Sequence, residues 1–377
     1  MKVCTPHCGI APESGSGGEV YERELLRDLA GHGVDVHILL ARGKPHDRVP
    51  GWTVHPVWPP KGLRWPVMPF VMPRAIKRVW DAGRFDLLRA HSVRFIGPAA
   101  LIARRRYRLP VPVVTHHHHL DPSPLNPHLE KRVLVASDAI VTDSEFAKRQ
   151  LEDELGIRGD HVRVVYCGVG PKYRPEAKSA ELLRRWGLEG RRVLLSLGPL
   201  IERKNPFFLL EAFRDVHAAL GGAVSLVWVG SGPLRGAVLD RARALGIADA
   251  VVLTGYLPEA DKVPMLNLAD VFVFPSLLEG FPLAPQEAMS CGKPVVAFRV
   301  ASLGEMIEDG ATGFLTAKND RAAFAERTGR LLSDEPMRAA FGRAAAERVD
   351  RYFRWDLTVR SVLKIYQEVV DEARRGR

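Results

Sequence analysis

Short runs of Val, Ile and Leu alternate along the chain with segments whose apolar residues recur every three or four positions. Runs of the first kind are typical of buried parallel strands, and segments of the second kind of the helices that cover them. Strands are predicted at residues 2–6, 34–41, 85–91, 110–116, 139–144 and 161–166, and again at 191–198, 223–230, 250–255, 271–276 and 293–298. This alternation predicts an α/β fold with parallel sheets.

The pattern divides into two series of strands, separated by residues 167–179, which are rich in Gly and Pro and show no periodicity. We interpret this segment as a linker. With 377 residues, the chain suits two doubly wound, Rossmann-like domains, at 1–172 and 173–355, better than a single core. After about residue 350 a long amphipathic helix follows that belongs to no strand.

Composition and charge narrow the function. The formal net charge of +10 indicates affinity for something anionic, such as nucleic acid, a phosphorylated ligand or an acidic membrane surface. The basic residues carry no zinc-finger, RNA-binding or basic-zipper pattern, so we expect no nucleic-acid partner. No apolar run is long enough to span a membrane and the N-terminus does not resemble a signal peptide, so the expected location is cytoplasmic.

The four cysteines predict reduced thiols, because only Cys4 and Cys8 are close in sequence and their spacing is not that of common zinc or redox motifs. A metal set of Cys4, His7 and Cys8 is the alternative. We favour a buried first strand, and find no acidic cluster with the spacing of a magnesium site.

Two glutamates, Glu279 and Glu287, flank the start of a predicted helix that follows the strand at 271–276. Gly280 allows close backbone approach, and Pro285 suits the first helical position. A helix start binds phosphate through free N–H groups, while carboxylates accept hydrogen bonds from hydroxyls. The combination therefore predicts a site for a phosphate next to a sugar. The alternative is that Glu287 only interacts with the helix dipole.

Residues 275–297, PSLLEGFPLAPQEAMSCGKPVVA, resemble the C-terminal motif of the retaining glycosyltransferases of family 4. Residues 15–39, 196–206, 227–234 and 354–366 are similar to other segments of that family, so the resemblance spans nearly the whole chain. It implies the GT-B fold, two Rossmann-like domains facing a central cleft, with the C-terminal helix at 356–377 packing back on the first domain.

The resemblance also implies roles for individual residues. Glu287 would bind the ribose hydroxyls, Glu279 the transferred sugar, and Lys204 the distal phosphate. The remaining implied donor contacts are Gly17, Gly18, Gly232, Tyr256, Leu257, Gly280, Phe281, Pro282, Leu283 and Ala284. Pro199 stands where the family has an arginine, and Arg203 is the candidate replacement. Pro282 stands where a glycine is common and removes one backbone N–H.

Four consecutive histidines, His116 to His119, end the strand at 110–116. Because side chains of a strand alternate between its faces, at most two of them can share a metal. The family has a histidine near the sugar at this point, which we assign to His117, with His116 or His118 as alternatives.

The implied reaction is transfer of a hexose from a nucleoside-diphosphate sugar of the UDP or GDP type to an acceptor hydroxyl, with retention and without a metal or other cofactor. The acceptor would be a glycan, a lipid-linked sugar or a small molecule. Two alternatives are a GT-B sugar-nucleotide epimerase and a basic protein with a degenerate site that binds membranes or nucleic acid.

One further segment suggests a partner. Residues 61–80 mix Trp, Met, Phe and Val with five basic residues, which predicts a peripheral contact with an anionic membrane or a helix packed on the first domain. Three prolines in this segment argue against a single continuous amphipathic helix.

Overall fold

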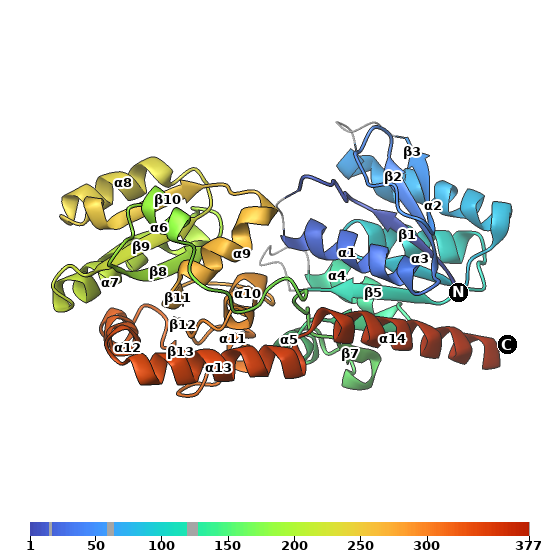
Figure 1. Cartoon of the computed structure of the whole chain (residues 1–377). Coiled ribbons are helices and arrows are strands. Elements are labelled where there is room, and N and C mark those ends of the chain that lie inside the picture. Colours follow the sequence, from blue (N-terminus) through green and yellow to red (C-terminus); the bar gives the residue numbers. More distant parts are fainter. Residues whose placement is uncertain (15–16, 59–63, 119–126, 377) are drawn as a thin grey trace. The chain divides into compact units, whose positions relative to one another are not determined.

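A computed structural model describes residues 1–14, 17–58, 64–118 and 127–376 (Figure 1). The chain forms two compact units: unit 1 comprises Met1–Cys167 and Leu357–Arg377, and unit 2 comprises Gly168–Asp356. Among the described residues, no helix has both the length and the apolar character needed to cross a membrane.

Unit 1 contains a parallel sheet of seven strands in the order β3-β2-β1-β4-β5-β6-β7. Its strands are β1 (Lys2–His7), β2 (Asp35–Ala41), β3 (Trp52–Val57), β4 (Leu87–Ala90), β5 (Val113–His117), β6 (Ala139–Thr142) and β7 (Val162–Val164). Its helices are α1 (Gly17–Gly31), α2 (Arg64–Gly83), α3 (Ile96–Arg106), α4 (Pro127–Val135), α5 (Glu145–Leu155) and most of α14 (Trp355–Arg375).

The two faces of this sheet can be told apart at β4. Leu88 belongs to the apolar cluster that contains Met72 and Ile76 of α2 and residues of α3. The next residue, Arg89, points the other way and contacts α1 and α14. Since successive side chains of a strand point to opposite faces, α2 and α3 cover one face of the sheet and α1 and α14 the other.

Unit 2 repeats the architecture with six parallel strands in the order β10-β9-β8-β11-β12-β13. The strands are β8 (Arg192–Leu197), β9 (Val224–Val229), β10 (Val251–Gly255), β11 (Val271–Phe274), β12 (Val295–Phe298) and β13 (Gly313–Thr316). The helices are α6 (Ala180–Arg185), α7 (Pro206–Ala219), α8 (Arg235–Ala244), α9 (Glu259–Leu268), α10 (Leu283–Ser290), α11 (Leu303–Met306), α12 (Arg321–Ser333) and α13 (Glu335–Tyr352).

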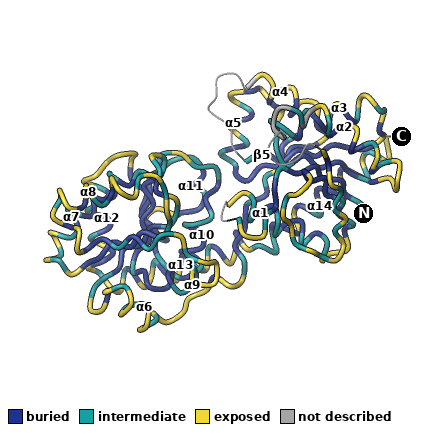
Figure 2. The backbone as a smooth tube through the Cα atoms, turned by 90° about the horizontal axis from the view of Figure 1, so that it is seen from above, coloured by how far each residue is buried: buried dark blue, intermediate teal, exposed yellow. Residues whose placement is uncertain are grey.

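The strands form the buried layer of each unit (Figure 2). All eleven predicted strands are present, and the α/β fold is confirmed. Two strands were missed, β3 and β13, each at the edge of its sheet. β3 is largely half-buried or exposed and contains Pro56, so it lacks the apolar run of a central strand. β13 is buried throughout and is as long as β4, β6, β11 and β12, so its length does not explain why it was missed.

The observed boundary between the units lies at Gly168, not at residue 173 as predicted. Val169 pairs with Arg354, and its N–H donates to the Phe353 carbonyl over 2.8 Å. A Cβ at Gly168 would meet the Arg354 backbone at 2.4 Å. These contacts bind the start of the predicted linker to unit 2.

The segment around residue 70 corrects another expectation. α2 is one continuous helix of 20 residues although it includes Pro66, Pro69 and Pro73. Pro66 is the third residue of α2, among the first four whose N–H groups have no partner within the helix. Pro69 and Pro73 lie further along, where each removes one hydrogen bond of the helix. Phe70 is 76 % exposed.

Candidate active site

The loops that follow β8 and β11 bring two basic residues and a glutamate together. After β8 the chain passes Gly198 and forms a short 3-10 turn, Glu202–Lys204, before α7 starts at Pro206. After β11 it forms the loop that carries Ser276 and Glu279. In a parallel sheet these loops lie beyond the carboxyl ends of neighbouring strands, where open α/β sheets bind ligands.

One oxygen of Glu279 accepts from three donors. Its Oε1 atom lies 2.5 Å from Lys204 Nζ and 2.6 Å from Arg203 NH1, and Ser276 Oγ donates to it over 2.5 Å. Arg203 NH1 also donates to the Leu278 carbonyl over 2.8 Å. The structure therefore places Arg203 beside Lys204, with its side chain still 41 % exposed, which suits the role of replacement for the arginine absent at Pro199.

Lys204 and Glu279 are more deeply buried than charged side chains usually are. The side chains of Lys204 and Glu279 are only 10 % and 9 % exposed, and Lys204 Nζ lies 4.4 Å from the centre of the Phe274 ring. Burial lowers the pKa of Lys204, and Glu279 opposes that shift by stabilising the ammonium form. The two basic residues are thus held in a partly dry site, where electrostatic interactions are stronger than in water.

Glu287 lies in α10, which begins at Leu283, two residues earlier than the predicted start at Pro285. Pro285 is tolerated there because the first four N–H groups of a helix lack an intrahelical partner anyway. Glu287 is 5 % exposed. Lys262 Nζ donates to its Oε1 over 2.6 Å, whereas its buried Oε2 has no hydrogen-bond partner among the described residues.

Lys262 belongs to a polar group that sequence reasoning missed. Tyr173 and Lys172 both donate to Glu259 Oε1, over 2.8 Å and 2.7 Å, and Lys262 Nζ lies 3.8 Å from Glu259 Oε2. Burial raises the pKa of Tyr173, and the carboxylates of Glu287 and Glu259 raise it further. In the sequence, the one indication of this polar group is Lys262 itself, a basic residue one turn after the start of α9.

Gly232 has a packing role. A Cβ at this position would meet Leu200 O at 2.4 Å, so a side chain would separate the loop after β9 from the loop after β8. Gly230 is similar, because its Cβ would meet Gly198 O at 2.1 Å. Both glycines let these two loops pack closely, which supports the turn that carries Lys204.

The other predicted donor contacts lie on three segments. Tyr256 is 64 % exposed directly after β10, and Leu257 is half-buried. Gly280 accepts through its carbonyl from Ser302 Oγ, Phe281 and Pro282 are buried, and Leu283 and Ala284 form the half-buried first turn of α10. In unit 1, Gly17 and Gly18 belong to the first turn of α1 and not to the preceding loop, and a Cβ at either would meet no atom within 4 Å.

The histidines of β5 differ in their surroundings. His116 is buried and its Nε2 lies 2.8 Å from Tyr366 Oη, and His117 is 2 % exposed. His118 is one-third exposed, with Nδ1 3.3 Å from Asp143 Oδ2. Burial would lower the pKa of His118, but the hydrogen bond to Asp143 and its charge raise it. His119 lies outside the described residues.

Two family models match the chain: Glycosyltransferase Family 4 over residues 15–173 and Glycosyl transferases group 1 over residues 179–348. A curated relative from Acidothermus cellulolyticus, named D-inositol 3-phosphate glycosyltransferase, is 32 % identical over 98 % of this chain and 88 % of its own length. The chain belongs to glycosyltransferase family 4. It is a glycosyltransferase, which transfers a sugar from a nucleotide sugar.

Solved structures agree with the fold of this family 4 glycosyltransferase. Sucrose-phosphate synthase from Thermosynechococcus elongatus superposes with a TM-score of 0.81 at 20 % identity, covering 98 % of this chain and 99 % of the other. Anabaena HepE in complex with UDP superposes with a TM-score of 0.79 at 19 % identity, covering 97 % and 99 %. The two Rossmann-like units are therefore those of the GT-B fold.

The glycosyltransferase also has a buried polar network in unit 1. Arg89 donates to both oxygens of Glu22 over 2.6 and 2.7 Å and to Tyr366 Oη over 2.7 Å. Burial by itself would raise the pKa of Glu22, but Arg89 overrides it and holds the pKa well below its ordinary value. The network joins α1, β4 and α14.

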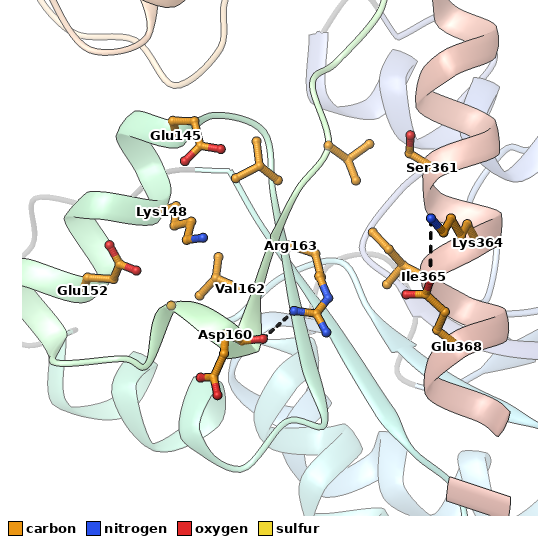
Figure 3. A pocket seen from close by; sticks show the side chains of 13 residues that line it. Glu145, Lys148, Glu152, Asp160, Val162, Arg163, Ser361, Lys364, Ile365 and Glu368 are labelled. Atoms are coloured by element: carbon orange, nitrogen blue, oxygen red, sulfur yellow. Dashed lines mark hydrogen bonds and ion pairs between the residues drawn. The ribbon is translucent and has the colours of Figure 1, made fainter. Parts of the chain in front are cut away.

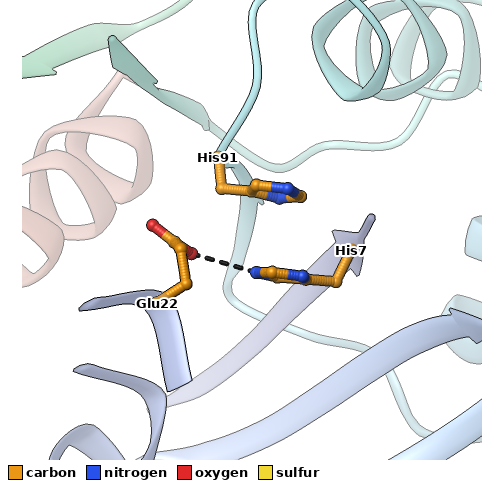
Figure 4. A group of neighbouring side chains, drawn as sticks. All are labelled: His7, Glu22 and His91. Atoms are coloured by element: carbon orange, nitrogen blue, oxygen red, sulfur yellow. Dashed lines mark hydrogen bonds and ion pairs between the residues drawn. The ribbon is translucent and has the colours of Figure 1, made fainter. Parts of the chain in front are cut away.

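His7 and His91 stack beside Glu22, with ring centroids 3.7 Å apart (Figure 4). The Gly9 N–H donates to His7 Nδ1 and the Cys8 N–H faces His91 Nε2, so these ring lone pairs are already engaged. Among the described residues, His7, Glu22 and His91 form one group whose ligand atoms lie close enough to hold a metal ion. His118, Asp143 and Cys167 form a second such group. The alternative metal set of Cys4, His7 and Cys8 is not among these groups of described residues. Its His7 faces Glu22 instead.

A surface groove of the glycosyltransferase lies between α5, β7 and α14 (Figure 3). Its lining includes none of the residues predicted for the site in unit 1. Its charged side chains are of both signs and include Lys148, Arg163, Glu152 and Glu368. This mixture selects no particular charge on a ligand.

Proposed function

We propose that this glycosyltransferase is a retaining hexosyltransferase that binds a nucleoside-diphosphate sugar of the UDP or GDP type on unit 2 and needs no metal or other cofactor. The observation that carries the proposal is the ion pair of the buried Lys204 and Glu279, joined by the partly exposed Arg203. Glu279 is followed in the chain by α10, which carries Glu287. The resemblance of HepE, a protein solved with UDP, supports the choice of nucleotide.

The chemistry of sugar transfer explains the two basic residues. When the bond between the anomeric carbon and the phosphate oxygen breaks, negative charge develops on that oxygen. Lys204 and Arg203 are held in a partly buried position where they can stabilise this charge without reorganising at the moment of reaction. In the retaining reaction implied by the family, the leaving phosphate accepts the proton of the acceptor hydroxyl while the new glycosidic bond forms.

Glu287 supplies the second half of the proposed donor site. Its Oε2 atom is a buried carboxylate oxygen with no hydrogen-bond partner among the described residues, and such an atom costs free energy unless a donor reaches it. The two adjacent hydroxyls of a ribose are suitable donors. Lys262 neutralises the other oxygen of the carboxylate, which fixes its orientation.

Glu287→Ala should therefore weaken nucleotide binding by about tenfold, the loss of one or two hydrogen bonds to a charged group. Calorimetric titration of wild type and variant with UDP, GDP, ADP and CMP, with EDTA present, measures this effect and identifies the base. Equal binding of the best nucleotide by both proteins would remove Glu287 from the site. Binding only after a divalent cation is added would overturn the metal-independent mechanism.

We propose a carbohydrate, a lipid-linked sugar or a small polyol as the acceptor. The curated relatives from Acidothermus cellulolyticus and Stackebrandtia nassauensis are both named D-inositol 3-phosphate glycosyltransferase. A phosphorylated polyol is therefore the first acceptor to test. The net charge of +10 favours an anionic acceptor of any of these kinds.

A peripheral contact with an anionic membrane is the second part of the proposal. α2 exposes Phe70, Arg74 and Arg78, a combination of apolar and basic side chains that suits a lipid surface. Phe70→Ser should reduce sedimentation of the protein with vesicles of anionic phospholipid at least severalfold and leave nucleotide binding unchanged. Vesicle binding that stays the same in Phe70→Ser would contradict this contact.

A further inference from the structure

Glu279 contacts two basic residues, although its proposed role is to bind the hydroxyl groups of the transferred sugar. A carboxylate that binds the transferred sugar should face hydroxyl groups, yet its Oε1 atom accepts from Lys204 Nζ at 2.5 Å and Arg203 NH1 at 2.6 Å. Those are the two basic groups assigned to the diphosphate. Before a nucleotide binds, the carboxylate is therefore paired with both of them and offsets one of their two positive charges.

A diphosphate and Glu279 compete for the same donors. Both are anionic, and in a site where Lys204 and Glu279 are about nine-tenths buried, two anions on one pair of cations repel each other strongly. Binding of the diphosphate must therefore separate Glu279 from at least part of this contact. Once separated, a buried carboxylate needs new hydrogen-bond donors.

The two kinds of nucleotide differ in what they offer to the displaced carboxylate. A nucleotide sugar brings hydroxyl groups that can donate to Glu279 in place of the two basic residues. A free nucleoside diphosphate lacks the hydroxyl groups of the transferred sugar, because its only hydroxyls are those of the ribose assigned to Glu287, and it carries additional charge on its terminal phosphate. Ser276 can keep its hydrogen bond to Glu279 with either ligand, but only the attached sugar supplies donors that replace the two basic residues.

We propose that Glu279 makes the donor site discriminate between intact nucleotide sugar and free nucleoside diphosphate, by returning to Lys204 and Arg203 when the sugar has left. The inference rests on the proposed function, in which unit 2 binds the nucleotide. It adds a second role for Glu279: after transfer the carboxylate competes with the product diphosphate and speeds its release.

The test is Glu279→Gln, because glutamine keeps the size and hydrogen-bonding capacity of the side chain and removes its charge. Calorimetry with UDP and GDP should show that the variant binds the preferred diphosphate at least about tenfold more tightly than wild type, corresponding to roughly 1.4 kcal/mol. Its inhibition constant as a product should fall in the same proportion, while turnover decreases.

Glu202→Gln is the matched control. Glu202 belongs to the same 3-10 turn and is exposed, so its substitution removes the same charge nearby without affecting the contact to Lys204. We expect its affinity for the diphosphate to stay within about twofold of wild type. If both variants gain the same affinity for the diphosphate, the cause is a general change in surface potential and not the contact of Glu279 with Lys204 and Arg203.

The remaining outcomes separate the inference from the function on which it rests. Diphosphate binding in Glu279→Gln that is unchanged or weaker, with wild-type binding that depends on Lys204, would overturn the competition while keeping the donor site. Absence of diphosphate binding in wild type, or binding that is insensitive to Lys204→Ala, would overturn the proposed function itself.

Discussion

Lys204→Ala should lower kcat/KM for sugar transfer by about 10²- to 10³-fold, the usual effect of removing one preorganised group that stabilises developing negative charge. Lys204 Nζ is placed by the 3-10 turn after β8 and held between Glu279 and the Phe274 ring. Water cannot replace it fully, because the side chain is 10 % exposed. Steady-state kinetics with the nucleotide sugar identified by calorimetry measures the effect.

Lys318→Ala provides the comparison for this experiment. Lys318 is an exposed lysine of the same unit, so its removal changes the net charge equally and should alter kcat/KM by less than about twofold. If Lys204→Ala retains more than a third of the wild-type kcat/KM, Lys204 does not stabilise the leaving group. Lys204→Arg distinguishes charge from shape, since it keeps the charge but not the compact ammonium group.

Arg89→Met should destabilise unit 1 by about 3–5 kcal/mol, because it leaves the buried Glu22 carboxylate without its main partner. Arg89 is fully buried and donates to both oxygens of Glu22 as well as to Tyr366 of α14. For a unit of this size the loss corresponds to a decrease in Tm of roughly 6–20 °C. Calorimetric or circular-dichroism melting of the full chain measures it.

Two further variants test the origin of that loss. Arg374→Met breaks the ion pair of Arg374 with Asp86 on the same unit, but both groups are partly exposed, so the expected cost is below about 1 kcal/mol. Combining Arg89→Met with Glu22→Leu removes both buried charges and should restore much of the stability. If the double variant is no more stable than Arg89→Met alone, the buried charge is not the cause.

Pattern and motif in the sequence anticipated much of the protein. Central strands are continuous apolar runs because both of their faces are buried, and all nine were predicted, together with the edge strands β7 and β10. The edge strand β3 was missed because it is largely half-buried or exposed. The edge strand β13 was missed although it is buried throughout. The continuous helix α2 was also misjudged, because only Pro66 lies in its first turn and the helix continues through Pro69 and Pro73.

The sequence by itself therefore determined the α/β class, the two sheets, and which segments carry glutamate, lysine and histidine near strand ends. Only the tertiary structure decided the partners of these residues. In the structure, Lys262 contacts Glu287, and Lys204 and Arg203 contact one oxygen of Glu279. Arg89 donates a hydrogen bond to Tyr366. The physical reason is that periodicity records which face of an element is buried, whereas a polar contact joins side chains such as Arg89 and Tyr366, 277 positions apart in the chain.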